Sequence, residues 1–394
     1  MTDSSENKAL LPAGLHDLLP PRAAQESATI AGIMDVFNSC GYEQVKPPLV
    51  EFESTLVGNG ANGGGSLAGQ MFRLMDPASQ RMMAVRADIT LQVARIAGTR
   101  MVDVPRPVRL SYAGQILRVR GNQLRPERQF AQVGVELIGL DDVAADVEVI
   151  ILAAEGLRAA GISEPTIDIN SPALVANILS GIDLDDSAVS DLRESLDRKD
   201  AGATEEILRA QGVLLSDSGK ALCALIRTVG PADQVIEELK SIDLPDGARA
   251  EVQRLTDVVL GVSTASPDLS LALDPVEYRG FEYQTGVSFT VFAEGVRGEL
   301  ARGGRYITES GEAATGVSLY MDTILRALPE ATPVSRLYLP TGTAFSVGQA
   351  QRADGWITVA ALGDVQNAAA EATRLGCSHI LINDKPVAVD GTDS

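Results

Sequence analysis

The stretch Tyr278-Arg279-Gly280-Phe281-Glu282-Tyr283-Gln284-Thr285-Gly286 decides how this chain is interpreted. It places a cation and an acid three residues apart, between two tyrosines, inside an otherwise apolar run. The run predicts a buried strand, and charges in a buried strand are stable only when they pair with each other or bind something. By itself the stretch therefore indicates one half of an amino-acid-binding pocket.

The composition excludes several classes of protein. The chain has 394 residues, 45% hydrophobic and 22% charged, which suits a globular protein of two or three domains. No apolar run reaches the roughly 18 residues that a membrane span needs, and the polar, acidic first six residues do not resemble a secretory signal. Three scattered cysteines without a CxxC pair and two distant histidines predict no disulfide framework, no metal site and no cofactor. We therefore expect a cytoplasmic protein with no membrane partner.

The charge is unevenly distributed. The net charge is -20, yet residues 81–128 contain ten arginines, no lysine and only three acids, which makes this window +7. Arginine favours planar, bidentate contacts with carboxylates and phosphates. Two interpretations stay open, namely structural arginines paired with acids elsewhere and a cleft that faces an anion. The ten are Arg81, Arg86, Arg95, Arg100, Arg106, Arg109, Arg118, Arg120, Arg125 and Arg128.

Hydrophobic periodicity predicts four regions. Residues 1–9 are expected to be disordered, and residues 10–170 and 266–330 to form a core of strands and helices without regular βαβ alternation. Residues 171–265 have helical spacing throughout and predict an inserted helical module. Residues 331–394 predict a small α/β domain. The predicted class is α+β, with an antiparallel sheet flanked by helices.

The order of motifs resembles the catalytic half of a class II aminoacyl-tRNA synthetase, and most closely the histidyl branch. The resemblance covers residues 10–330 approximately, and its motifs are specific together although each is weak alone. Residues 41–51 look like motif 1, residues 116–120 with 128–136 like motif 2, and residues 301–306 with 316–319 like the approach to motif 3. Residues 85–90 are similar to the LRPEGT strand end, and Arg279–Tyr283 resembles the histidyl RGLDY signature.

The departures from this family concern its ATP and tRNA parts. The acid of motif 2 that holds adenine is replaced by Arg120, and the motif 3 arginine that binds the γ-phosphate is replaced within Met321-Asp322-Thr323. Loss of such a preorganised cation should slow adenylate formation by about 10²–10³-fold or more. Residues 331–394 carry four basic residues against six acids, an unsuitable surface for an anticodon. We therefore expect that the chain does not aminoacylate tRNA and has no catalytic residues. We also expect that it does not bind tRNA.

The residues of the family's amino-acid pocket, unlike those of its ATP and tRNA parts, are mostly retained in this sequence. The resemblance implies that Asp88 and Thr90 bind the α-amino group of histidine, that Gln132 contacts the amino acid, and that Arg118 and Arg279 contact its carboxylate. Glu136 and Tyr283 would face the imidazole, and Tyr306 completes the expected set. Gln284 stands where the family has a second tyrosine. Other interpretations stay open: Asp88 as a helix cap only, Glu136 and Arg279 as a structural ion pair, and Tyr283 as a core residue.

A synthetase fold with a histidine pocket but altered ATP and tRNA parts resembles one known family, the regulatory subunits of ATP phosphoribosyltransferase. The resemblance implies a non-catalytic subunit that assembles with the short-form catalytic subunit in the first step of histidine biosynthesis and lets histidine inhibit it. It also implies self-association as a dimer through motif 1. The alternatives are a divergent histidyl-tRNA synthetase and another amino-acid-binding paralogue of the synthetases.

Overall fold

The computed structural model describes residues 11–57, 68–122, 125–277, 284–330 and 334–389. Contacts divide the chain into two compact units, Met1–Pro329 and Glu330–Ser394, and each is described by itself. The expected disordered stretch 1–9 lies outside the described residues. So do Arg279 and Tyr283 of the signature stretch.

The first unit is built on a nine-stranded sheet with the order β1-β5-β6-β12-β11-β10-β7-β9-β8. Its strands pair antiparallel except for the β1–β5 and β7–β9 pairs, which are parallel. The predicted α+β class with a largely antiparallel sheet is therefore confirmed. In this order the strands are β1 (Glu43–Gln44), β5 (Val108–Leu117), β6 (Gln129–Ile138), β12 (Ala313–Tyr320), β11 (Ala301–Ile307), β10 (Ser288–Phe292), β7 (Thr166–Asn170), β9 (Ser270–Leu273) and β8 (Gly230–Pro231).

One face of this sheet is apolar and packs against helices. Successive strand residues point to opposite faces, so alternate positions supply the core, which includes Val133, Val135 and Leu137 of β6. The covering helices include α1 (Arg22–Ser39) and α5 (Val143–Ala159). The carboxylate of Asp142 accepts a hydrogen bond from Ala144 N and caps α5, a preferred start for a helix. The other face carries buried polar side chains such as Gln132 and Glu136, together with a second apolar cluster that includes Leu110 and Ile138.

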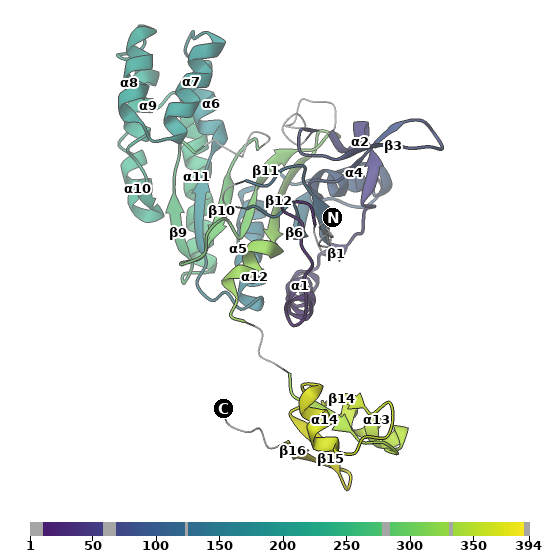
Figure 1. Ribbon diagram of the computed structural model, residues 1–394. Coiled ribbons are helices and arrows are strands. Elements are labelled where there is room, and N and C mark those ends of the chain that lie inside the picture. Colours follow the sequence, from purple (N-terminus) through teal and green to yellow (C-terminus); the bar gives the residue numbers. More distant parts are fainter. Residues whose placement is uncertain (1–10, 58–67, 123–124, 278–283, 331–333, 390–394) are drawn as a thin grey trace, which may run out of the picture. The chain divides into compact units, whose positions relative to one another are not determined.

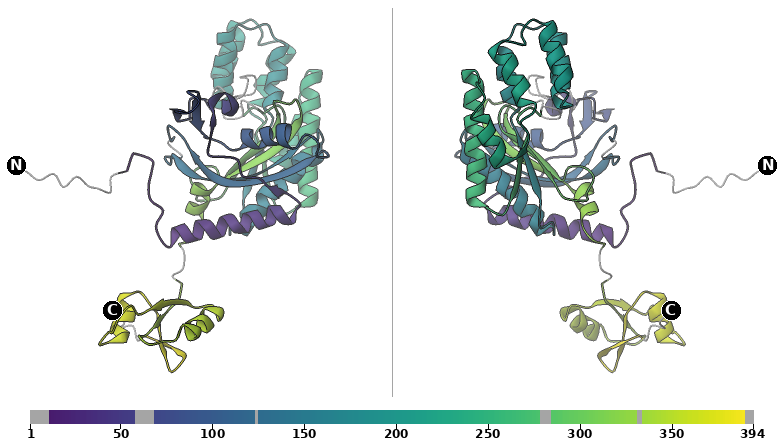
Figure 2. Two further views of the ribbon diagram at one scale, coloured as in Figure 1. Left: turned by 90° about the vertical axis from the view of Figure 1, so that its right-hand side faces the viewer. Right: turned by 90° about the vertical axis from the view of Figure 1, so that its left-hand side faces the viewer.

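The predicted helical insertion connects β7 to its parallel neighbour β9. Helices α7 to α10 gather at one end of the first unit, whereas α11 runs beside the sheet (Figures 1 and 2). The two-residue strand β8, between α9 and α10, joins the edge of the main sheet, which the helical spacing did not indicate. The helices are α6 (Pro172–Ser180), α7 (Asp186–Asp197), α8 (Ala201–Ala210), α9 (Asp217–Leu225), α10 (Ala232–Leu239) and α11 (Asp246–Ala265).

The remaining elements of the first unit lie apart from the main sheet's strands, and among them α12 packs in the apolar core through Met321 and Ile324. A small antiparallel sheet has the order β2-β4-β3, and helix α4 follows β4 in the chain. These elements are β2 (Val50–Phe52), α2 (Glu53–Val57), β3 (Arg73–Met75), β4 (Met82–Val85), α4 (Thr90–Arg100) and α12 (Met321–Ala327).

The second unit has a four-stranded sheet of order β14-β13-β15-β16, with parallel pairing around β13 and an antiparallel final hairpin. Tyr338, Ala372, Cys377 and Ile380 form part of its own core. The elements are β13 (Arg336–Leu339), α13 (Phe345–Ala353), β14 (Ile357–Ala360), α14 (Ala368–Arg374), β15 (His379–Ile382) and β16 (Lys385–Ala388). In the described parts of the chain, no helix is long and apolar enough to cross a membrane.

One strand is shorter than the sequence predicted. The apolar run from Phe281 to Phe292 indicated one continuous strand, but β10 begins at Ser288, and the described residues 284–287 before it are not in a strand. They nevertheless follow β11, since Thr285 N donates to Arg305 O and Arg305 N donates to Val287 O, both at 2.9 Å. Two hydrogen bonds to one residue hold this segment beside β11 without forming a regular ladder.

Candidate functional site

The polar face of the sheet is hollowed over two glycines. The register places Glu136 of β6, Gly316 of β12, Gly304 of β11 and Ser288 of β10 in one row across four neighbouring strands. A Cβ atom at Gly316 would lie 1.8 Å from Glu136 Oε2, so only glycine lets the carboxylate of Glu136 lie across β12. The missing side chains create the hollow, and Glu136 forms one of its sides.

Glu136 is a fully buried carboxyl at this hollow. Its side chain is 0% exposed, and it accepts hydrogen bonds from Tyr306 Oη at 2.9 Å and from Tyr112 Oη at 3.4 Å. Burial raises the pKa of Glu136 to about 8, although the bonded hydroxyls oppose the rise. At neutral pH the ligand-free site therefore holds a proton on Glu136, which it can share with a basic ligand.

A second acid lies at the start of α4 and is bonded into the same site. Asp88 Oδ1 accepts from Thr90 N at 2.8 Å, and Asp88 Oδ2 accepts from Gln132 Nε2 at 3.0 Å. Gln132 Nε2 also donates to Ser318 Oγ at 2.6 Å, and its Oε1 accepts from Ile89 N at 3.0 Å. Asp88 thus helps to cap α4, as one interpretation held, and it also belongs to a side-chain network.

Tyr112 of β5 connects this network to Glu136. Its hydroxyl lies 2.9 Å from Ser318 Oγ and 3.3 Å from Thr90 Oγ1, besides the contact with Glu136. Side chains from β5, β6, β11, β12 and the start of α4 therefore form one polar network, and residues of all these elements except β5 line a cavity of about 10 Å³. That volume holds about one water molecule. The lining residues are Thr90, Glu136, Arg302, Gly304, Tyr306, Gly316, Val317 and Ser318.

Five of the eight expected site residues meet here, namely Asp88, Thr90, Gln132, Glu136 and Tyr306. Arg118 lies beside the site and is engaged elsewhere: its Nε donates to Ala87 O at 3.3 Å, and its guanidinium lies 5.3 Å from the centre of the Phe130 ring. The other two, Arg279 and Tyr283, lie outside the described residues.

Sequence reasoning missed two members of the network, Tyr112 and Ser318. Tyr112 lies in β5, four residues before the segment assigned to motif 2, and Ser318 lies in the stretch that resembles only the approach to motif 3. The sequence did contain a signal for Ser318. It lies two residues from Gly316, and residues two apart in a strand point to the same face. Pairing between β6 and β12 was needed to show that Ser318 meets Gln132, which lies 186 residues earlier in the chain.

The position of the lost motif 3 arginine is occupied by a buried ion pair. Asp322 Oδ2 lies 3.0 Å from Arg125 Nε, and the two side chains are 4% and 5% exposed. The guanidinium of Arg125 also lies 3.9 Å from the centre of the Tyr320 ring. An acid neutralised by an arginine offers no free cation to a phosphate group, so this part of the fold is not arranged to bind the γ-phosphate.

The other arginines of the 81–128 window mostly have partners within the fold. Arg109 makes two hydrogen bonds to Glu148, at 2.7 and 2.8 Å, and Arg95 Nη2 lies 2.6 Å from Glu51 Oε1. Arg106 pairs with Glu312. These contacts favour structural arginines over a single anion-facing cleft.

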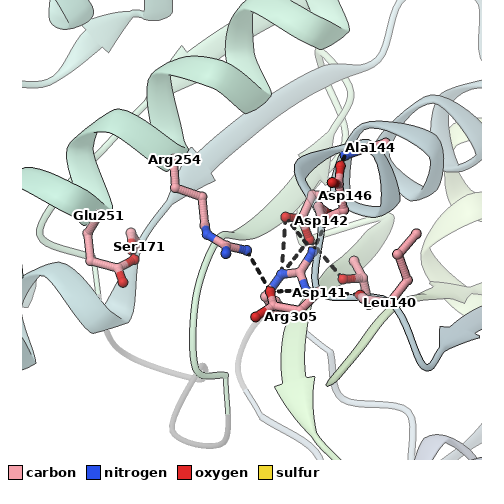
Figure 3. Close-up of polar contacts among 10 residues, drawn as sticks. Leu140, Asp141, Asp142, Ala144, Asp146, Ser171, Glu251, Arg254 and Arg305 are labelled. Carbon is pink, nitrogen blue, oxygen red and sulfur yellow. Dashed lines mark hydrogen bonds and ion pairs between the residues drawn. The ribbon is translucent and has the colours of Figure 1, made fainter. Parts of the chain in front are cut away.

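Behind the site, Arg305 joins the sheet to the helices on its apolar face (Figure 3). Its guanidinium donates to both carboxylate oxygens of Asp146, to Asp141 Oδ1 and to the carbonyl oxygens of Leu140 and Asp142, at 2.6 to 3.2 Å. Asp141 also accepts from Arg254 of α11 at 3.0 Å. The neighbours of Arg305 in β11 are Gly304 and Tyr306, so the strand that lines the cavity is also tied to the insertion.

The fold matches that of known proteins. A family model described as histidyl-tRNA synthetase matches residues 14–324. The crystal structure of an ATP phosphoribosyltransferase regulatory subunit/histidyl-tRNA synthetase from Bacillus halodurans has a TM-score of 0.80 at 23% identity, covering 95% of this chain and 97% of that one. An ATP phosphoribosyl transferase (HisG:HisZ) complex from Thermotoga maritima has a TM-score of 0.58 at 18% identity, covering 75% of this chain and 97% of the matched chain. The chain is therefore a protein of the histidyl-tRNA synthetase-like class.

Sequence similarity identifies the family within this class. The ATP phosphoribosyltransferase regulatory subunit of Rhodospirillum centenum is 51% identical over 383 residues, which are 96% of this chain and 97% of that protein. The chain belongs to the family of ATP phosphoribosyltransferase regulatory subunits, whose members act in histidine biosynthesis as regulatory partners and do not aminoacylate tRNA.

Proposed function

We propose that this chain assembles with the short-form catalytic subunit of ATP phosphoribosyltransferase and makes its activity sensitive to histidine, which binds in the hollow beside Glu136. The observation that carries the proposal is the hydrogen-bonded set of Asp88, Gln132 and Glu136 around a cavity over two glycines. The partner is supported by the name of the HisG:HisZ complex from Thermotoga maritima, whose matched chain shares this fold.

The chemistry of the hollow suits histidine. Asp88 is positioned to bind the α-amino group together with the hydroxyl of Thr90, and Gln132 holds that acid in place. Glu136 is a buried carboxyl that lines the hollow, where it can pair with an imidazole ring. Arg118, Arg279 and Tyr283 complete the proposed site as contacts of the carboxylate and of the ring.

A regulatory role requires histidine to bind one state of the complex better than another, because a ligand shifts an equilibrium between two states only through its different affinity for them. Histidine bound in the hollow would therefore favour one conformation of the subunit, with a coupling typically of about 1–3 kcal/mol.

Four further features belong to the proposal. The motif 1 segment around β1 and β2 mediates self-association as a dimer, in line with the resemblance to class II synthetases. The acidic residues 331–394, with four basic residues against six acids, do not bind tRNA. The ion pair of Arg125 with Asp322 supports a subunit without ATP chemistry of its own. Finally, we place the protein in the cytoplasm, and the free thiols Cys40, Cys223 and Cys377 suit that reducing compartment.

Reconstitution with the catalytic subunit tests the proposal. Formation of phosphoribosyl-ATP should require mixing of the two chains, and added histidine should inhibit it. Glu136→Ala should leave activity of the complex in place but raise the histidine concentration needed for inhibition at least tenfold, whereas the exposed Glu294→Ala serves as the matched control. Histidine-dependent pyrophosphate exchange by the isolated chain would contradict the proposal, as would equal inhibition of wild type and Glu136→Ala.

A further inference from the structure

Asp168 of β7 is a partly buried acid with an unused oxygen. Its neighbours Ile167 and Ile169 belong to the apolar core, so Asp168 points to the opposite, polar face of the sheet. Its Oδ1 is buried, and among the residues that the structure describes no donor bonds to it. More than about nine-tenths of buried polar groups in folded proteins have a hydrogen-bond partner. This oxygen is therefore a candidate contact for a ligand.

A second unused oxygen faces the same space from the next strand. Thr290 of β10 is directly opposite Asp168 in the antiparallel pair, so both side chains lie on one face. Thr290 is 2% exposed, and within the described ranges its Oγ1 also lacks a hydrogen-bond partner. A buried hydroxyl without a partner beside an acid without a partner indicates a group that binds to both.

Two further acids border this space. Asn170, two residues from Asp168 on the same face, donates from Nδ2 to Glu277 Oε2 at 3.1 Å and holds that carboxylate near it. Asp274 directly follows β9, the parallel neighbour of β7, and forms an ion pair with Lys199 of the insertion. The ammonium group of Lys199 is thus committed to Asp274, and Asp168 remains without a cation of its own.

The crowding of acids leaves a proton in the cluster. Burial, together with the charges of Glu277 and Asp274, raises the pKa of Asp168 to about 7, and Lys199 opposes the rise. Burial and Asp274 likewise raise the pKa of Glu277, while its hydrogen bond from the Asn170 amide and the charges of Arg302 of β11 and Lys199 lower it. At neutral pH Asp168 therefore carries a proton about half of the time, and a cation bound there would displace it.

We propose that Asp168, Thr290 and Glu277 form a binding site for a primary ammonium group. An ammonium has three N–H donors and no acceptor, which matches one acceptor oxygen from each of the three side chains. Lys199 and Asp274 form the same kind of pair at the end of the neighbouring strand. A metal ion fits less well, because no group of three or more acids, histidines or cysteines in the described parts of the chain is arranged to hold one.

This site is separate from the hollow beside Glu136. The register places Arg302 of β11 between Thr290 of β10 and Ser318 of β12, and Arg302 lines the cavity of Glu136. The ammonium site therefore lies beyond Arg302, over β10 and β7. Two sources supply this chemistry, namely a lysine side chain of the catalytic subunit and a free small amine.

Calorimetric titration of the full chain with butylammonium chloride tests the site, because this ion has the charged end of a lysine side chain. At pH 8 wild type should bind it, and Asp168→Asn, which keeps the shape of the side chain, should weaken binding at least about tenfold. Thr290→Val should weaken it about threefold or more. Asp183→Asn, which replaces an exposed acid of the insertion, is the matched control and should bind like wild type.

Proton release gives a readout that a purely structural role would not produce. Each ammonium ion bound by protonated Asp168 should release one proton to solvent, so about half a proton per ion is expected at pH 7 and fewer at higher pH. Titration in buffers of different ionisation heat counts these protons. Below pH 7 the affinity of wild type should fall by up to about tenfold per pH unit.

The results separate this site from the histidine pocket, whose affinity is measured independently. Absence of butylammonium binding, equal binding by Asp168→Asn, or binding at pH 7 without proton release would overturn the site, and the last of these needs no variant to fold. Titration of the complex with the catalytic subunit, which rests on the proposed assembly, distinguishes the sources. Loss of butylammonium binding in the complex would assign the ammonium to a lysine of that partner, and unchanged binding would assign it to a free amine.

Discussion

Arg125 and Asp322 form a buried ion pair, with Arg125 Nε 3.0 Å from Asp322 Oδ2 and both side chains no more than 5% exposed. Removing one partner of such a pair leaves an uncompensated charge in the interior. We therefore expect Asp322→Ala to lower the free energy of unfolding by about 3–5 kcal/mol, measured by urea denaturation.

The double variant Arg125→Met/Asp322→Leu is the matched comparison for this pair. It removes both charges and fills the space with apolar atoms, so its stability should lie much closer to that of wild type. Equal stabilities of Asp322→Ala and wild type would show that the pair is not buried as described.

The pH dependence of histidine binding follows from the pKa of Glu136. The free carboxyl holds its proton below about pH 8, and free imidazole holds one below about pH 6.5. The complex shares one proton between them. Affinity should therefore be greatest between about pH 6.5 and 8, where the free partners together hold one proton. Below this range both free partners hold a proton, and one must be released on binding. Above it neither holds one, and a proton must be taken up on binding. On each side the affinity should fall by up to tenfold per pH unit.

Calorimetry across pH 5.5 to 9.5 checks this profile. In Glu136→Gln the fall on the alkaline side should become less steep, because only the α-ammonium group of histidine still titrates there. A variant whose alkaline fall is as steep as that of wild type would show that Glu136 does not contribute to it.

Glu136 should also make the ligand-free protein less stable as pH rises. Burial raises its pKa from 4.5 to about 8, so between these values the folded state binds a proton that the unfolded state lacks. Stability from this group is thus fully present below pH 4.5 and is lost progressively up to pH 8, by roughly 1.4 kcal/mol per unit.

The difference in unfolding free energy between wild type and Glu136→Gln isolates this effect, because other titrating groups are common to both. Between pH 5 and pH 8.5, urea denaturation should show the free energy of unfolding of the variant rising by a few kcal/mol relative to that of wild type. A difference independent of pH would mean that Glu136 is solvated in the folded protein.

Gly316 should tolerate no side chain. A Cβ atom there would lie 1.8 Å from Glu136 Oε2 and 2.4 Å from its Cδ, so the buried carboxyl would have to leave its place and its hydrogen bond with Tyr306. We expect Gly316→Ala to destabilise the protein by about 1–3 kcal/mol and to abolish histidine binding. Thermal melting and calorimetry measure both effects.

Gly363→Ala is the matched control for this variant. Among the described residues no atom lies within 4 Å of its added Cβ, so the change should stay within about 0.5 kcal/mol and leave binding intact. Histidine binding by Gly316→Ala with wild-type affinity would place the pocket elsewhere.

Arg305 should resist even conservative replacement. Its guanidinium bonds two aspartates and two carbonyls at once, and a lysine ammonium lacks that planar fork. Arg305→Lys would leave Asp146, which is 1% exposed, poorly compensated, and we expect a loss of about 3 kcal/mol in urea denaturation. Arg254→Lys, whose partner Asp141 is 64% exposed, should change stability by less than about 1 kcal/mol.

Much of the fold was predictable because local signals agreed with it. Helical spacing throughout residues 171–265 predicted the inserted module, which contains α6 to α11. The two-residue strand β8 carries no periodicity and could not be found. The continuous strand predicted through Phe281 was too long, because apolar runs do not distinguish a strand from an extended segment that lies beside one.

By itself the sequence determined the class of protein and most of the acids and amides of the candidate site. Motif order indicated Asp88, Gln132 and Glu136, since these lie at fixed offsets within local segments. Only the tertiary structure showed that Ser318 and Tyr112 join them, that Asp322 is neutralised by Arg125, and that Gln284 packs over Gly304 with an unpaired amide. The physical reason is that hydrogen bonding and burial depend on which strands are neighbours, and β6, β11 and β12 are brought together from segments up to about 190 residues apart.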